Sequence, residues 1–133
     1  MAKAQNPEKF EQIKALKVAF ITEQVALTPE EAEPFWPVYN RYEKLLLEQR
    51  NLRRETFNKA IKAKGGISNL TEAEAQKLIV KYREIEERTF RLKQEKMEAV
   101  QKILSAKKIM QLYKAEISFT KRLMQRLKKR PKR

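Results

Sequence analysis

The sequence predicts an all-α protein of four helices, and three observations favour this fold class. A leucine followed by Thr or Ser precedes three long stretches, at Leu27-Thr28, Leu70-Thr71 and Leu104-Ser105. Small hydroxyl residues of this kind are typical of helix caps. Apolar residues within the stretches recur every third or fourth position, as on one face of a helix. Glycine occurs only twice in 133 residues, as Gly65-Gly66. Few turn signals between long periodic stretches favour helices over strands.

The three starts predict their own capping interactions. Glu31 follows Thr28 by three residues, and Glu74 follows Thr71 at the same distance. A glutamate at this spacing can accept a hydrogen bond from the backbone N–H of the cap, whose hydroxyl accepts one from the glutamate's own N–H. We therefore expect Thr28, Thr71 and Ser105 to cap the second, third and fourth helices.

The first helix is expected from Pro7, capped by Asn6, to about Gln24. Proline is favoured at the first position of a helix, where its missing N–H costs nothing. Residues 1–6 are expected to be a disordered N-terminal segment. One face of the helix carries an apolar stripe that needs a packing partner: Phe10, Ile13, Leu16, Phe20 and Ile21.

The second helix is expected to follow Thr28 and to continue to about Lys64, where Gly65-Gly66 allows the chain to reverse. Pro34 and Pro37 each remove a backbone donor and crowd the preceding turn, so we expect a kink near Trp36. The aromatic residues of the chain cluster there, as Phe35, Trp36, Tyr39 and Tyr42. Two interpretations stay open, a core that buries the kink or a partly exposed binding surface.

The third helix is expected from Thr71 to about Leu104 and carries a heptad-like seam interrupted by Lys96. Its length, about 50 Å at 1.5 Å per residue, exceeds what a compact globule of this size can enclose. We therefore expect an elongated chain that covers its apolar surface by forming a homodimer. The seam residues are Ala75, Leu78, Tyr82, Ile85, Thr89, Leu92, Ala99 and Ile103.

The fourth helix is expected to follow Ser105, which makes residues 7–128 a single helical domain. Residues 129–133 are expected to be a disordered basic tail, because Pro131 ends any helix. The apolar positions of the fourth helix are Ile109, Met110, Leu112, Tyr113, Ile117, Leu123 and Leu127.

Composition argues against several classes of function. The chain has no His and no Cys, so the usual transition-metal ligands, the commonest general base and the thiol nucleophile are missing. A single glycine pair cannot build a phosphate-binding loop. We therefore expect no catalytic site, no metal, no nucleotide and no other cofactor, and we interpret the chain as a protein that is not an enzyme. The longest apolar runs are far shorter than the roughly 20 residues that an integral membrane span requires.

A positive charge excess points to anionic partners. Lys and Arg number 31 against 17 acidic residues, which gives a net charge of +14. The excess is concentrated from residue 105 onward, where the sequence has 11 cationic residues and one glutamate. Such a segment can bind nucleic acid, an anionic membrane or acidic proteins, or it can serve only solubility. Nucleic acid is the less favoured partner, because no aromatic residue is interleaved with the terminal basic run.

Two stretches carry a resemblance to a known family. The first is Leu27-Thr28-Pro29-Glu30-Glu31, which continues to Tyr42, and the second is Ile103-Leu104-Ser105 up to Lys108. With the helical layout and the basic excess, they resemble the Spy/CpxP family of periplasmic stress proteins, in particular its Bacteroidetes type. That family is known for a Leu-Thr-x-x-Gln motif. Glu31 and Lys108 stand where the motif has Gln, and Ser105 stands in place of the second Thr.

The resemblance implies a cradle-like antiparallel homodimer in the periplasm. The chain would be a mature form without its signal peptide, acting as an ATP-independent chaperone or an envelope-stress sensor. Unfolded or acidic client proteins would bind a basic, partly apolar concave face. The alternative is a helical scaffold or partner-binding regulator. The residues expected to bind clients are Arg50, Arg53, Arg54, Lys59, Arg88 and Arg91.

Overall fold

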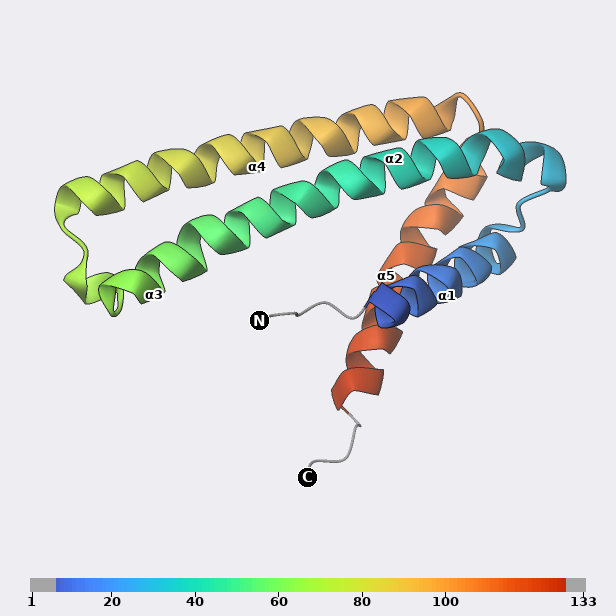
Figure 1. The fold of residues 1–133 in the computed structure, drawn as a ribbon. Helices are drawn as coiled ribbons and strands as arrows, with labels where there is room; N and C mark the ends of the chain where they lie inside the picture. The colour runs from blue at the N-terminus through green and yellow to red at the C-terminus, as the bar shows by residue number, and fades with distance from the viewer. Residues whose placement is uncertain (1–6, 129–133) are drawn as a thin grey trace. The chain divides into compact units, whose positions relative to one another are not determined.

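The computed structural model describes residues 7–128, without the side chains of Pro7, Glu8 and Phe10. All elements in this range are helical (Figure 1). The expected cap Asn6, the segment 1–6 and the tail 129–133 lie outside the described residues. The elements are α1 (Pro7–Val25), α2 (Pro29–Arg54), the π-helix η1 (Glu55–Lys59), α3 (Ala60–Lys64), the 3₁₀-helix η2 (Ile67–Asn69), α4 (Glu72–Gln101) and α5 (Ala106–Lys128).

The all-α fold class is confirmed, and the four predicted helices are present. The predicted second helix consists of α2, η1 and α3 in sequence, and α4 ends at Gln101, three residues before the predicted end. The helical pattern of α2 continues through Pro34 and Pro37, so the expected kink near Trp36 stays a prediction. The interruption of the α-helical pattern lies further on, at η1.

The chain forms two compact units. Within residues 7–128, unit 1 consists of residues 7–34 and 103–128, and unit 2 is Phe35–Lys102. Each unit therefore has its own packing to explain. The single domain expected over residues 7–128 and its pairing into a homodimer stay predictions.

Unit 2 is a helical hairpin in which α2 and α4 lie side by side (Figure 1). Tyr42, Leu46 and Leu92 form its buried cluster, and Val38, Leu45 and Ala99 pack against it. The predicted seam of α4 thus faces α2 of the same chain. Ile85 of the predicted seam is also buried, and so is Val100, which the predicted seam did not include. The seam alone therefore does not require a second chain.

Lys96, which interrupts the apolar seam, is buried with only 6% of its surface exposed. Its Nζ lies 3.0 Å from Oε2 of Glu43 and 4.6 Å from the centre of the Tyr39 ring. A charge inside a seam is tolerated when it is paired in this way. The lysine is consequently part of the packing of unit 2.

The turn between α3 and α4 depends on glycine. Gly65 has φ 86° and ends α3, and its N–H and that of Gly66 bond back to Lys62 O and Ile61 O, both at 3.0 Å. This pair of bonds is the Schellman motif, which favours glycine because φ is positive. Thr71 and Glu74 then form the predicted capping box. Lys64 Nζ lies 2.7 Å from Oε2 of Glu74.

Unit 1 is formed by α1 packed against α5, together with the first residues of α2. The Phe20 and Phe119 rings meet with centroids 5.8 Å apart, and the Arg122 guanidinium lies 4.9 Å from the centre of the Phe20 ring. The buried residues of this unit are Ile21, Val25, Leu104, Ile109, Leu112 and Ala115.

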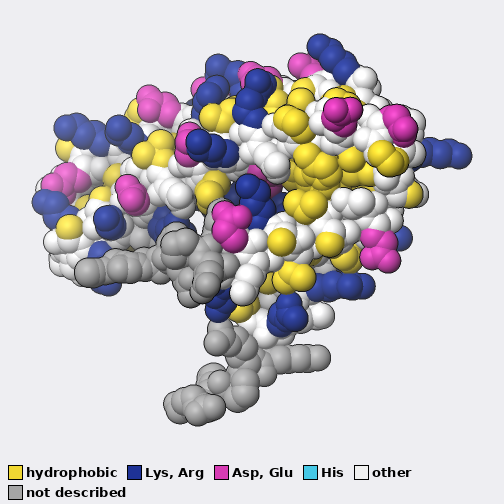
Figure 2. All heavy atoms as spheres, turned by 45° about the vertical axis from the view of Figure 1, so that its right-hand side comes forward, with side chains coloured by type: hydrophobic (Ala, Val, Ile, Leu, Met, Phe, Trp, Pro, Cys, Tyr) yellow, Lys and Arg dark blue, Asp and Glu magenta, His cyan; other side chains and the backbone are white. Residues whose placement is uncertain are grey.

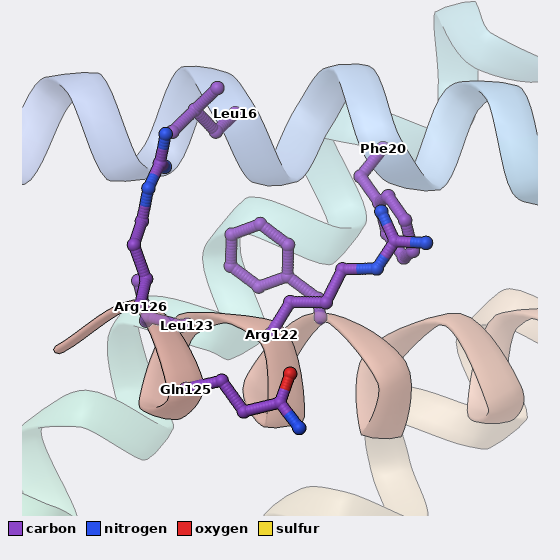
Figure 3. A pocket seen from close by; sticks show the side chains of 7 residues that line it. Leu16, Phe20, Arg122, Leu123, Gln125 and Arg126 are labelled. Atoms are coloured by element: carbon purple, nitrogen blue, oxygen red, sulfur yellow. The ribbon is translucent and has the colours of Figure 1, made fainter. Parts of the chain in front are cut away.

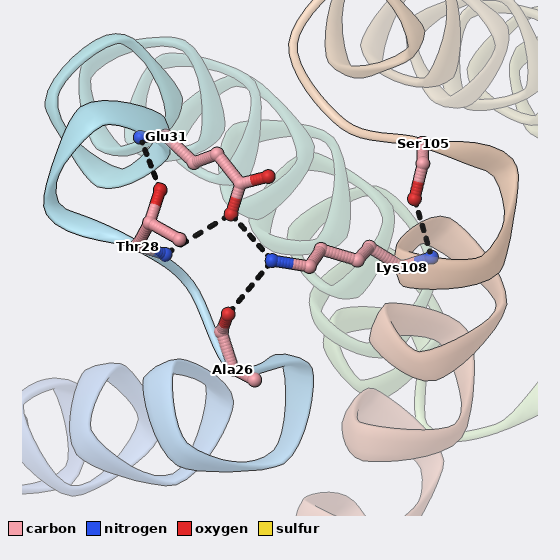
Figure 4. Close-up of polar contacts among 5 residues, drawn as sticks. All are labelled: Ala26, Thr28, Glu31, Ser105 and Lys108. Atoms are coloured by element: carbon pink, nitrogen blue, oxygen red, sulfur yellow. Dashed lines mark hydrogen bonds and ion pairs between the residues drawn. The ribbon is translucent and has the colours of Figure 1, made fainter.

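Lys108 connects three elements of unit 1 (Figure 4). Its Nζ donates to Oε1 of Glu31 at 2.6 Å and to the carbonyl of Ala26 at 2.8 Å. Glu31 is also part of the predicted box, because Thr28 N donates to Glu31 Oε1 and Glu31 N to Thr28 Oγ1. The predicted cap Ser105 accepts from Lys108 N at 3.3 Å. One lysine thus joins the end of α1, the start of α2 and the start of α5.

Ala26 ends α1 with φ 59°, the only positive φ outside glycine among the described residues. Ala26 N bonds to Glu23 O at 3.2 Å and Leu27 N to Thr22 O at 3.1 Å. This is again a Schellman motif, with alanine where glycine is preferred. A left-handed alanine carries a small conformational cost, which the surrounding hydrogen bonds must offset.

Candidate functional site

Unit 2 carries a shallow cationic hollow where α2 passes into η1. We call it the arginine hollow. Three arginines of α2 line it together with two aromatic rings, Phe57 and Tyr82, which meet edge to face with centroids 5.1 Å apart. The residues that line it are Arg50, Arg53, Arg54, Phe57, Asn58 and Tyr82.

The π-helix η1 places Phe57 and Asn58 in this hollow. A π-helical turn holds more residues than an α-helical turn, so the side chains that follow it are rotated relative to a regular helix. Sequence reasoning did not predict η1. The only local signal is weak helix propensity at Thr56, Phe57 and Asn58. Short π-helical segments of this kind are frequent at functional sites.

The polar groups around the hollow favour binding of anions over proton transfer. The pKa of Tyr82 is raised, first because its hydroxyl is hydrogen-bonded to Glu86 and then because of the charge of that carboxylate, while Arg53 acts in the opposite direction. The Tyr82 hydroxyl is therefore already engaged with the Glu86 carboxylate, and the arginines are the donors left for a ligand. Arg54 donates to Asn51 Oδ1, which restricts its guanidinium. Carboxylates suit such a set of fixed donors.

The six residues predicted to bind clients do not all come together. Arg50, Arg53 and Arg54 line the hollow, whereas Lys59 is exposed on η1 outside its lining. Arg88 and Arg91 are exposed on α4 and lie about 120° and about 180° around that helix from Tyr82. Arg91 Nη2 also pairs with Glu87 Oε2 at 3.4 Å. The predicted set therefore divides into a cluster on α2 and separate cations elsewhere.

The predicted aromatic cluster is mostly interior. Phe35, Tyr39 and Tyr42 are buried, and Trp36 is half-buried. The Phe35 and Tyr39 rings stack at 5.1 Å, and the Trp36 ring meets each of them edge to face. Of these four residues, only Trp36 is partly exposed.

A second hollow lies in unit 1, between α1 and α5, and we call it the Phe20 hollow. In Figure 3, Arg122 and Arg126 reach from α5 toward α1, whereas Gln125 points away from it. Its floor is apolar, and its rim carries two guanidinium groups. Sequence reasoning missed this site, although Arg122 and Arg126, four residues apart, share one face of α5. The lining residues are Leu16, Phe20, Phe119, Arg122, Leu123, Gln125 and Arg126.

Neither hollow carries groups arranged for metal chemistry. Among residues 7–128, the structure contains no group of three or more His, Cys, Asp or Glu side chains that could hold a metal ion. In the same range, no helix is long and apolar enough to span a membrane. Comparison of the chain with known protein families, with curated proteins and with solved structures gives no match.

Proposed function

We propose that the protein is a periplasmic, ATP-independent chaperone or stress sensor that binds unfolded, acidic client proteins. The observation that carries this proposal is the arginine hollow, which Arg50, Arg53 and Arg54 line together with Phe57 and Tyr82. An unfolded acidic segment offers carboxylates and apolar side chains together. The hollow offers guanidinium donors and ring surface together, so each contact is weak and tolerant of sequence.

Exposed apolar side chains support the same proposal. Ile79, Val80 and Phe90 are exposed along α4, and 62% of the Phe90 surface is accessible. On the face in Figure 2, lysine and arginine side chains lie among exposed hydrophobic side chains. Cations can attract an acidic client over a distance, and apolar groups can hold it after contact.

The proposal also rests on the resemblance to the Spy/CpxP family. Glu31 and Lys108 stand where the family's short motif has Gln, and these two side chains form the 2.6 Å ion pair of unit 1. Two sequence motifs that are far apart along the chain therefore meet in space. The family's cradle-like homodimer and periplasmic location are part of this proposal.

The test is suppression of aggregation. Stoichiometric protein without ATP should keep a thermally unfolding acidic client from scattering light. Changing Arg50, Arg53 and Arg54 to Gln should weaken this several-fold, and about 1 M salt should act similarly, because the screening length then falls to about 3 Å.

Matched variants make the test specific. Changing Lys77, Lys81 and Lys93 to Gln removes the same charge from exposed positions of α4 and should have little effect. Changing Lys59, Arg88 and Arg91 to Gln measures how much the other three predicted client-binding residues contribute to the suppression of aggregation. If all three variants suppress aggregation as well as the wild type does, the proposal is wrong.

Two further measurements address assembly and the main alternatives. Sedimentation at micromolar concentration should give about twice the chain mass of 15.8 kDa. Deletion of residues 129–133 should leave client protection unchanged. If the deletion instead removes the only measurable binding, to a nucleic-acid duplex, the protein is a nucleic-acid-binding protein. Binding to a folded partner without protection of unfolded clients would favour the alternative function, a helical scaffold or partner-binding regulator.

A further inference from the structure

α5 has two apolar faces, and only one of them packs against α1. Ile109, Leu112 and Ala115 are buried. A second face remains exposed, with 66% of the Met110 surface and 69% of the Ile117 surface accessible. We call this second face the α5 stripe. It comprises Met110, Tyr113, Ile117, Thr120, Met124 and Leu127.

The α5 stripe has the spacing of a coiled-coil seam. Its six residues follow one another at alternating steps of three and four, and they fall within about 100° of arc on the helix. Such a narrow, regular stripe matches the a and d positions of a helix that pairs with another helix. Met at these positions adapts readily to a partner's shape.

A row of lysines borders the stripe on one side. Lys107, Lys114, Lys121 and Lys128 are spaced by seven residues and are all exposed. We call them the lysine row, which occupies the e positions of the same heptads. The opposite border is Ile109, Glu116 and Leu123, of which Ile109 is buried. The exposed edge of the stripe is therefore uniformly cationic.

We propose that the α5 stripe and the lysine row form a docking site for an acidic amphipathic helix of a partner protein. The partner would present apolar residues at its own a and d positions and Glu or Asp opposite the lysine row. This partner is a folded helix and not an unfolded client, so the proposal goes beyond the proposed function.

Charge complementarity selects this occupant. A second copy of α5, paired antiparallel as in the proposed homodimer, would bring its own lysine row against the first. An antiparallel pair would place the e-position lysines of both copies side by side. A helix that lies on an anionic membrane presents a polar face rich in Lys and Arg opposite its apolar face. In α5, the side opposite the stripe carries the buried Leu112 and Ala115 and packs against α1.

The experiment uses the full chain and a synthetic helical peptide of about three heptads, with Leu and Ile at a and d and Glu at e and g. Fluorescence anisotropy of the labelled peptide should show binding to the wild-type protein. Changing the four lysines of the lysine row to Gln should weaken binding by about tenfold, the combined effect of four modest ion pairs. Ile117→Asn, an exposed position, should also weaken binding.

Controls separate helix docking from charge alone. A scrambled peptide of the same composition should not bind, and changing Lys62, Lys77, Lys81 and Lys93 to Gln should leave binding unchanged. Circular dichroism should show equal helicity for all protein variants. The proposal also predicts that the lysine-row variant still protects clients. Failure of the docking site can therefore be distinguished from failure of the proposed function.

Several results would overturn the docking site. Equal binding of the scrambled peptide would show attraction by charge alone. Binding of anionic vesicles, lost in the Ile117→Asn variant, without binding of the helical peptide would assign the stripe to a membrane surface. A fall in sedimentation mass caused by Ile117→Asn would assign it to a contact between two copies of this chain.

Discussion

The turns that lead into α2 and α4 have nearly the same sequence pattern but are stabilised differently. Leu27-Thr28 with Glu31 opens α2, and Leu70-Thr71 with Glu74 opens α4, each through a reciprocal capping box. Each capping glutamate also binds a lysine. Lys64 lies 10 residues before Glu74, whereas Lys108 lies 77 residues beyond Glu31. The same local motif thus closes one turn by itself and joins distant segments at the other.

The surroundings of the two ion pairs differ accordingly. The side chains of Lys64 and Glu74 are 49% and 37% exposed, against 24% and 25% for Lys108 and Glu31. Lys108 also donates to the carbonyl of Ala26, the left-handed residue that ends α1. An exposed local pair contributes little to stability, whereas a partly buried pair between distant segments also restricts the chain. Four substitutions or conditions test this comparison.

Gly65→Ala should have the largest effect, a destabilisation of about 1–2 kcal/mol. Its φ of 86° disfavours any side chain, and an added Cβ would lie 2.9 Å from Nδ2 of Asn69. Asn69 would then have to move and give up its bond to Lys64 O. Denaturant unfolding measures the loss. Asn69→Ala should cost less, because it removes only the hydrogen bond.

Lys108→Met should destabilise by about 1 kcal/mol, because it removes two charge-assisted hydrogen bonds between distant segments. The matched change, Lys64→Met, should leave the melting temperature within experimental error of the wild type. Thermal melts of both variants make the comparison. Equal effects of the two variants would mean that the long-range lysine adds nothing beyond a local pair.

Ala26→Gly should stabilise the protein by up to about 1 kcal/mol, because glycine adopts φ 59° without the cost that a Cβ imposes. The hydrogen bond from Lys108 Nζ uses only the backbone carbonyl of residue 26 as its acceptor, so it should persist. Chemical denaturation checks the gain. A destabilised variant would show that the alanine methyl group contributes packing that outweighs its conformational cost.

Acid should weaken both turns, and its effect on stability should be the smallest of the four. The hydrogen bond from Lys108, followed by that from Thr28 N–H, lowers the pKa of Glu31, and the hydrogen bonds from Lys64 and Thr71 do the same for Glu74. A glutamate whose pKa is lowered by folding stabilises the folded state at pH values above its unfolded pKa, about 4.3. This stabilisation is lost as the pH falls through the folded pKa. Melting temperatures should therefore fall below about pH 4, and the fall should be shallower in the Lys108→Met variant.

Much of the fold could be predicted because its signals are local. The caps Thr28, Thr71 and Ser105 and the reversal at Gly65-Gly66 lie where the sequence places them. Of the candidate site, the sequence identified the arginines of α2 but not their aromatic neighbours. Phe57 enters the hollow through a π-helical turn, which depends on a small shift in backbone bonding that residue types signal only weakly.

The sequence by itself therefore determined the helices, their caps and the cationic character of the surface, because propensity, capping and charge act over a few residues. Only the tertiary structure decided the partners. It paired Lys96 with Glu43 and Lys108 with Glu31, packed the α4 seam against α2 of the same chain, and left the α5 stripe exposed. These outcomes depend on which helices meet, and contacts between residues distant along the chain are not encoded in local periodicity.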